Sequence, residues 1–548
     1  MTSSSENNRK LREMVRKQRG GIMPKQALLL ALITLLWSGS AFAQGGPCSS
    51  QSDKLACALP QEFGPGLAFS GVLEPVGRHA AHFSVGTSDF AATIKPLTQD
   101  ISRQANLLPI ASPSSGIVLV YDKSINSFTT STDSLGPVLG ERAETVGRHH
   151  LFIGFSYQFF NFNKLDGINL NNFPAVLTHT DDSTDNTSTV PGSPVNTCSI
   201  SGRSGTSSLN GCSFVRDRID TTNSISLKVN QYTTYVTFGL TKRIDVSAII
   251  PIENVRMSLG SDATIVPGTN GLITPVPGSP DATNHNQNVT GTNGPPYFFH
   301  LWKNCPNTSP AGGLGALDPS CLNHNFPDAS FSGGGPSPAN SATGIGDVVA
   351  RVKWNAWEGE RAGFAAGMDI RFATGDALNY LGSGSYGFKP FAVFSYRARI
   401  SPHVKVGYEW NTDSVTAGDL TTTTKGKLPN DFNYTVGADA KIVKWMTGSF
   451  DIVGQRLFGA DTVSETAQQF LGNCGACTAN SNPATVTLQS LTANTNQSYN
   501  ITNASIGIKA RILPKVSRLV FTANVLIRLD DGGLGSKPAP LFGLGYTF

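Results

Sequence analysis

The residues that could do chemistry in this sequence are glycine-rich turns, histidines and cysteines, and none of them forms a catalytic motif. Gly382 to Gly387 spells G-x-G-x-x-G, but dinucleotide binding needs a strand before this motif and a helix after it. A strand pattern follows instead, which indicates a hairpin loop. No G-x-S-x-G or G-x-x-x-x-G-K-[ST] occurs, and the nine histidines are scattered. We therefore expect no catalytic residue, no metal and no cofactor.

The eight cysteines fall in four neighbouring pairs, each within a polar segment. In an exported chain, such neighbouring cysteines are interpreted most simply as short-range disulfides. The alternative for Cys474-Gly-Ala-Cys477 is a redox or zinc site, because C-x-x-C can serve both purposes. No helix pattern follows this motif, and no second Cys or His pair lies nearby. We predict the disulfides Cys48–Cys57, Cys198–Cys212, Cys305–Cys321 and Cys474–Cys477.

Composition excludes several classes of protein. Only 15% of the residues are charged, against about 25% in ordinary soluble domains, which argues against coiled coils, helix bundles and highly charged disorder. Residues 1–25 carry a net charge of +5, and because the whole chain carries +4 the remainder carries −1. The sequence therefore indicates no nucleic-acid partner.

The N-terminal residues have the three parts of a secretory signal peptide. An apolar run, Ala27 to Trp37, follows the basic segment and precedes Ala41-Phe42-Ala43, so cleavage is expected after Ala43 and residues 1–43 form the signal. A membrane anchor would need about 20 apolar residues, more than this run provides. Met23 could start a shorter precursor with the same signal. Export leaves a periplasmic protein, a secreted protein or a membrane barrel.

From about residue 148, apolar and polar residues alternate in successive segments. In 363–373 one face carries only apolar side chains, from Phe364 to Phe372, whereas the other carries Asp369 and Arg371. A period of two indicates strands. We predict twelve, at 148–162, 223–240, 244–257, 344–357, 363–373, 385–399, 404–411, 430–442, 446–457, 500–511, 518–529 and 539–548.

The connections between these strands predict an all-β, antiparallel up-and-down barrel in the outer membrane, spanning 148–548. Short turns and long polar loops alternate along the chain, which is typical of such barrels. A soluble β-sandwich also alternates, but it does not explain a second face filled with Gly, Thr, Ser and Asn. The predicted long extracellular loops are 163–222, 258–343, 412–429 and 458–499.

The segment 44–147 fits three interpretations: a plug inside the barrel, a periplasmic extension, or two further strands that make fourteen. Thr93 to Leu108 predicts a short helix, with Pro96 in its first turn. Residues 116–121 and 126–131 predict a small hairpin around Asp122-Lys123-Ser124.

The C-terminal segment resembles the strand by which insertion machinery recognises bacterial outer-membrane barrels. One of its faces carries only apolar and aromatic side chains, and the other carries Gly543, Gly545 and Thr547. The expected assembly signal comprises Phe542, Leu544, Tyr546 and Phe548.

Three stretches resemble a known family. They are Gly344-Ile345-Gly346-Asp347-Val348-Val349, "RFATGDALNYLGSGSYGFKPF" at 371–391 and "GLTKRIDVSAIIPI" at 239–252. They are similar to the outer-membrane barrel family named after the MetA pathway of phenol degradation, a distant relative of channels for fatty acids and aromatic hydrocarbons. The resemblance implies a channel for small solutes, hydrophobic or aromatic ones among them. The alternative is a structural, receptor or adhesin-like barrel that acts through its long loops; an enzyme is a weaker candidate.

The inward faces of the strands predict the residues that line the lumen. If 358–362 closes a regular hairpin, Trp357 faces Gly363 and Arg351 faces Asp369 near the membrane midplane, with Arg371 as a diagonal partner of Asp369. We predict that this cluster narrows the pore, although a solvated pair that only keeps the lumen polar is an open alternative. The further inward charges are Glu409 and Asp439.

The expected partners are outer-membrane lipid, the barrel-insertion machinery and a small-molecule solute. Replacing Phe548 by Ser should lower insertion several-fold, because it removes an aromatic side chain from the recognised face. The fraction of heat-modifiable barrel in outer-membrane extracts measures this, with Thr547→Ser on the opposite face as control. Equal assembly of the two variants would remove the recognition argument.

Overall fold

The computed structural model describes residues 54–57, 98, 100–101, 119–122, 127–130, 134–178, 218–266, 330–332, 341–420, 424–471, 485–511 and 518–548. The chain divides into two compact units, 1–43 and 44–548. The first unit, which holds the predicted signal peptide, lies outside the described residues.

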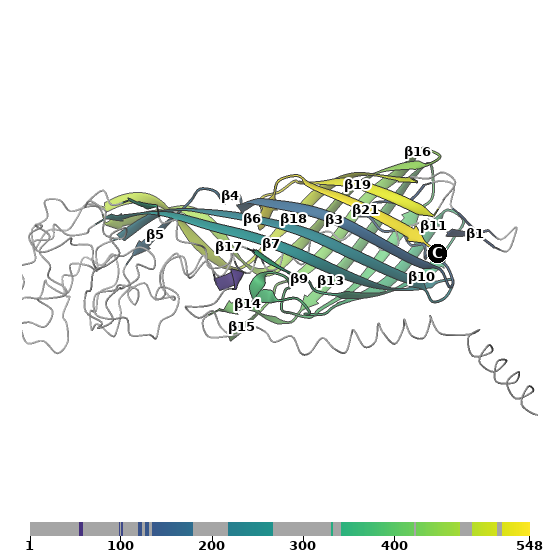
Figure 1. The fold of residues 1–548 in the computed structure, drawn as a ribbon, viewed down its shortest axis with the longest axis horizontal. Coiled ribbons are helices and arrows are strands. Elements are labelled where there is room, and N and C mark those ends of the chain that lie inside the picture. Colours follow the sequence, from purple (N-terminus) through teal and green to yellow (C-terminus); the bar gives the residue numbers. More distant parts are fainter. Residues whose placement is uncertain are drawn as a thin grey trace, which may run out of the picture. The chain divides into compact units, whose positions relative to one another are not determined.

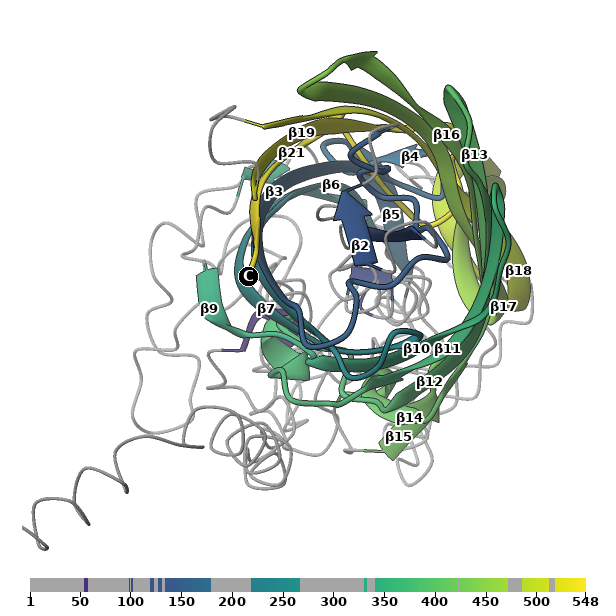
Figure 2. The ribbon, with the colours of Figure 1, turned by 90° about the vertical axis from the view of Figure 1, so that its right-hand side faces the viewer.

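Twelve antiparallel strands form a closed barrel, as the alternation predicts (Figure 2). Each strand pairs with the next one along the chain, and the last pairs with the first, with Leu544 opposite Phe155. The barrel strands are β3 (Leu151–Leu165), β6 (Arg218–Gly239), β7 (Ile244–Val266), β10 (Val349–Glu358), β11 (Ala362–Arg371), β12 (Gly387–Tyr396), β13 (Ile400–Asn411), β16 (Asn430–Val443), β17 (Met446–Leu471), β18 (Thr485–Arg511), β19 (Leu519–Arg528) and β21 (Ala539–Thr547).

Shorter elements occupy the connections. The predicted hairpin is present as β1 (Leu119–Asp122) and β2 (Ser127–Thr130), which pair only with each other in the described chain, so the barrel has twelve strands and not fourteen. Residues 98, 100 and 101 are helical, and the rest of the predicted helix lies outside the described residues. The other elements are β4 (Ile168–Asn169), β5 (Phe173–Thr178), β8 (Ser330–Ser332), β9 (Ser341–Ile345), β14 (Asp413–Asp419), β15 (Thr424–Lys427), β20 (Leu534–Ser536) and a 3₁₀ turn at Ala377–Asn379.

Four strands are longer than the alternation indicates. β6, β7, β17 and β18 continue past the other strands at the end away from the C-terminus (Figure 1). β17 and β18 therefore extend into 458–499, which the sequence predicts as loop. Their outer parts are rich in polar residues; for example, the hydroxyls of Thr466 and Thr492 hydrogen-bond at 2.8 Å. Because these polar residues interrupt the apolar alternation, the pattern does not reveal the outer parts of the strands.

The barrel has an apolar exterior and a polar interior. Large apolar side chains on the outward positions are open to the surroundings, and Trp354, Trp410 and Phe450 are each 51% exposed. The inward positions hold buried charges, including Arg351 and Asp369. This inversion suits a wall that faces hydrocarbon outside and a polar lumen inside.

None of the helical segments that the structure describes is long and apolar enough to cross a membrane.

Cys57 is the one cysteine among the described residues; it is buried and disulfide-bonded. Its partner and the other predicted disulfides lie outside the described residues, so the pairing itself stays a prediction.

Candidate functional site

One group of charged lumen residues lies on four neighbouring strands, β10 to β13. Alternation points every second side chain of each strand inward. Arg351 and Asp369 lie directly opposite each other on β10 and β11. The guanidinium binds the carboxylate with two hydrogen bonds, of 2.6 Å from Nε to Oδ1 and 2.8 Å from Nη2 to Oδ2. This bidentate geometry is the strong form of an ion pair.

The register is as predicted at this pair but not at the turn. A β-bulge between Asn355 and Trp357 shifts the pairing, so that Trp357 faces Phe364 and not Gly363. A bulge inserts one extra residue and affects only the ladder on its turn side. The Arg351–Asp369 pair lies beyond it and keeps its register.

Arg371 does not pair with Asp369 as expected. Its Nη1 lies 3.0 Å from Asp347 Oδ2, and its Nε lies 3.0 Å from Glu409 Oε1. Gly387 faces Arg371 across the β11–β12 ladder. A Cβ at Gly387 would collide with the Glu409 carboxylate and the Arg371 guanidinium. The glycine therefore leaves space for Arg371 on β11 to reach Glu409 on β13.

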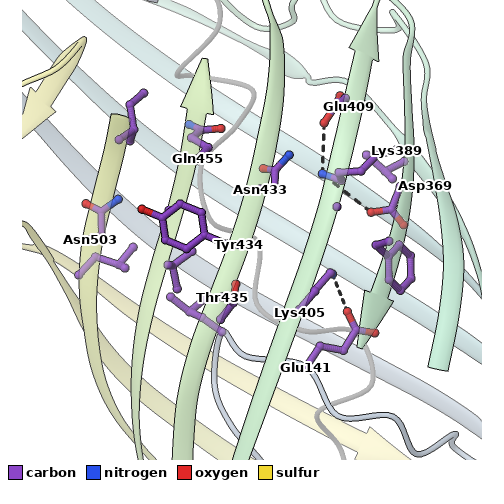
Figure 3. A pocket seen from close by; sticks show the side chains of 18 of the residues that line it. Glu141, Asp369, Lys389, Lys405, Glu409, Asn433, Tyr434, Thr435, Gln455 and Asn503 are labelled. Carbon is purple, nitrogen blue, oxygen red and sulfur yellow. Dashed lines mark hydrogen bonds and ion pairs between the residues drawn. The ribbon is translucent and has the colours of Figure 1, made fainter. Parts of the chain in front are cut away.

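Lys389 on β12 connects the two ion pairs. Its Nζ lies 3.2 Å from Glu409 Oε2 and 3.9 Å from Asp369 Oδ2 (Figure 3). We call Arg351, Asp369, Arg371, Lys389 and Glu409 the lumen ion cluster. The cluster is therefore larger than the sequence indicates.

Residues 134–147 lie inside the barrel and are buried throughout. Glu141 is the central contact of this inserted segment. Its carboxylate lies 2.6 Å from Lys405 Nζ, 2.9 Å from Arg351 Nη1 and 3.4 Å from Lys353 Nζ. These ion pairs attach the inserted segment to the lumen wall.

A second set of contacts holds the inserted segment near β16. Arg142 Nη2 lies 2.5 Å from Asp439 Oδ2, so Asp439, predicted as a lumen residue, faces inward and binds the inserted segment. Gly140 packs against His403, where a Cβ would collide with the imidazole. The imidazole Nε2 in turn lies 2.6 Å from Asp451 Oδ1.

Glu141 keeps its charge because cations surround it. Burial alone would raise the pKa of Glu141, but Arg351, Lys405 and Lys353 outweigh burial and lower it below the usual range. A lowered carboxyl pKa stabilises the inserted position of residues 134–147 above the usual carboxyl pKa, and this stabilisation is lost as the pH falls toward the lowered value.

A cavity of about 170 Å³ lies between the inserted segment and the wall. The lumen ion cluster and Lys405 line one part of it, and Asn433, Gln455 and Asn503 contribute amides (Figure 3). Apolar side chains line another part, among them Leu139, Phe160, Phe162, Val453, Leu526 and Leu534. The cavity can thus contact a solute that is apolar at one end and polar at the other.

Sequence reasoning missed Glu141, Asp347, Lys389 and Lys405. Asp347, Lys389 and Lys405 lie on the charged faces of their predicted strands, and those positions are the available signal. Glu141 lies in a segment without periodicity, so its approach to Arg351 could not be inferred.

Residues 322–469 match the family described as "Putative MetA-pathway of phenol degradation". The match confirms the resemblance over these residues. No curated protein matches the sequence.

Solved structures that match this chain include three outer-membrane proteins. The COG4313 outer membrane channel from Pseudomonas putida F1 is 9% identical, with a TM-score of 0.37 over 74% of this chain and 98% of that chain. A Pseudomonas aeruginosa FadL homologue is 10% identical, with a TM-score of 0.23 over 74% and 91%. The Ralstonia pickettii toluene transporter TbuX is 10% identical, with a TM-score of 0.23 over 73% and 90%.

Replacing Glu141 by Gln should open the lumen and make it more anion-selective. The change removes the carboxylate shared by Arg351, Lys353 and Lys405, and it leaves their positive charges without this partner. Planar-bilayer recordings should show a several-fold rise in open probability and a reversal potential shifted toward anions under a salt gradient.

The matched control is Glu144→Gln, which removes a carboxylate of the same segment 3.6 Å from Arg397. The control should leave the reversal potential close to that of the wild type. Identical recordings from wild type and Glu141→Gln would show that Glu141 does not keep the inserted segment in the lumen.

Proposed function

We propose that the protein is a bacterial outer-membrane channel for small solutes, with hydrophobic or aromatic compounds among them. The observation that carries the proposal is the lumen cavity, which has an ionic part and an apolar part. The predicted signal peptide and the apolar exterior of the barrel support the outer membrane as its location.

The cavity has the size for one small ring. A buried cavity of about 150 Å³ lined by apolar side chains binds benzene in a well-studied protein, and the cavity here is about 170 Å³. Phe160 and Phe162 are stacked with their centroids 5.8 Å apart and offer an aromatic surface. A phenol-like solute would place its ring on this surface and its hydroxyl toward the lumen ion cluster. The description of the matching family also concerns phenol.

A receptor or adhesin is the second candidate function. The observation in its favour is the pair of long hairpins, β6–β7 and β17–β18, which continue beyond the other barrel strands (Figure 1). Such a protein would bind through these hairpins and would not need a solute path through the lumen.

Filling the cavity tests the channel. Gln455 is 8% exposed and lines the cavity, so Gln455→Trp should place a bulky ring in the solute path. We expect single-channel conductance to fall several-fold and the current blocks caused by added phenol to disappear. Glycerol, which has no ring, should cause no such blocks in the wild type.

The control is Ile452→Trp, on the outward face of the same strand. It adds the same ring on the lipid side and should keep both the conductance and the phenol blocks. If neither wild type nor Glu141→Gln conducts or responds to phenol, the channel is contradicted and the receptor interpretation is favoured.

A further inference from the structure

Two cations lie side by side on the outer surface of the barrel. Lys228 on β6 and Arg256 on β7 are directly opposite each other in the ladder, and both are exposed. Like charges at such positions destabilise a sheet. Among the described residues no carboxylate forms an ion pair with either side chain. The pair is therefore open to an external anion.

Hydrogen bonds hold the surroundings of this pair in place. Arg256 Nε donates to Asn254 Oδ1 at 3.0 Å, and Asn254 Nδ2 donates to Thr343 Oγ1 at 2.6 Å. Asn230 Nδ2 donates to the same Asn254 oxygen at 3.3 Å, and Tyr157 OH donates to Asn230 Oδ1 at 2.9 Å. This network runs along the outward face and positions Arg256 next to neutral polar groups.

The pair lies at the outer limit of the apolar belt. Phe238 lies near the short turn of the β6–β7 hairpin, and Lys228 is about ten residues further along β6. This separation is about 33 Å along the strand. Because barrel strands tilt, it corresponds to about 25 Å along the barrel axis. The apolar band of such barrels is about 25 Å tall, with aromatic girdles at its edges. Tyr157 and Tyr232, whose ring centroids are 5.1 Å apart, lie next to Lys228 and Arg256 on the side of the short turn.

We propose that Lys228 and Arg256 bind the phosphate of a phosphorylated lipid headgroup in the outer leaflet. Arginine binds phosphate oxygens bidentately, and lysine adds a point charge. The acyl chains of such a lipid would lie against Phe155 and Ile252, which are outward and 47% and 44% exposed. This contact distinguishes a lipid from free phosphate. The inference rests on the outer-membrane location proposed above.

Arg456 on β17 provides a matched comparison. It is also exposed and outward, but its Nη1 donates to Asn500 Oδ1 at 3.3 Å and its guanidinium carbon lies 5.9 Å from the Phe458 ring centroid. No second described cation faces it across the ladder. A single cation with these partners should bind the headgroup phosphate weakly.

The experiment is native mass spectrometry of the purified barrel with a bis-phosphorylated lipid A or its dephosphorylated form. The wild type should retain the phosphorylated lipid preferentially, and Lys228→Gln combined with Arg256→Gln should lower that retention by about tenfold. Arg456→Gln should behave like the wild type. Equal retention of the two lipids, or no change in the double variant, would overturn the proposal.

Further measurements distinguish lipid binding from binding of free anions and from a defect in folding or conductance. Millimolar inorganic phosphate should leave the lipid bound, and displacement at that concentration would mean a site for free anions. Heat-modifiability and bilayer conductance of the double variant should equal those of the wild type, because neither residue lines the lumen. Failure of the proposed function would appear in fractionation and conductance, whereas failure of this inference would appear only in lipid retention.

Discussion

Closure of the hydrogen-bonded ring is the constraint on which the structure depends. Backbone N–H and C=O groups find no water in hydrocarbon, so a sheet can cross a membrane only if it has no free edge. The pairing of β21 with β3 removes the last edge. Once the ring is closed, each strand has one face toward lipid and one toward the lumen. The alternation in the sequence is the consequence of this requirement.

The inserted segment both covers and pairs the charged residues of the lumen. Inward side chains such as Arg351 and Lys353 are almost fully buried, and a buried charge is costly unless it is paired. The wall supplies Asp369 for Arg351, and the segment 134–147 supplies Glu141 for Arg351, Lys353 and Lys405. The segment and the lumen are therefore complementary in charge, and withdrawal of the segment would leave cations exposed to the pore.

The features that could be predicted from the sequence are those that depend on neighbouring residues in the chain. Alternation locates the twelve strands, and the short turn after β10 fixes Arg351 opposite Asp369 despite the bulge. The partners of Arg371 were not predictable. They depend on Gly387, which has no side chain to separate Arg371 from Glu409, and on the irregular backbone at Asp347. Glu141 is distant in sequence from Arg351, Lys353 and Lys405, and no periodic pattern encodes such contacts.

The residues that bind the inserted segment also line the cavity that a solute would enter in the proposed channel. Phe391 lies between two of the cations that bind Glu141, with Arg351 Cζ at 5.0 Å and Lys405 Nζ at 4.6 Å from its ring centroid. In the proposed channel, a solute with an aromatic ring and a negative or polarisable group would offer these cations the same kinds of contact. Such a solute would replace part of the negative charge that Glu141 provides, whereas a purely apolar solute would leave the cations unpaired. In the proposed channel, the free energy needed to separate Glu141 from these cations therefore depends on the chemistry of the solute that enters.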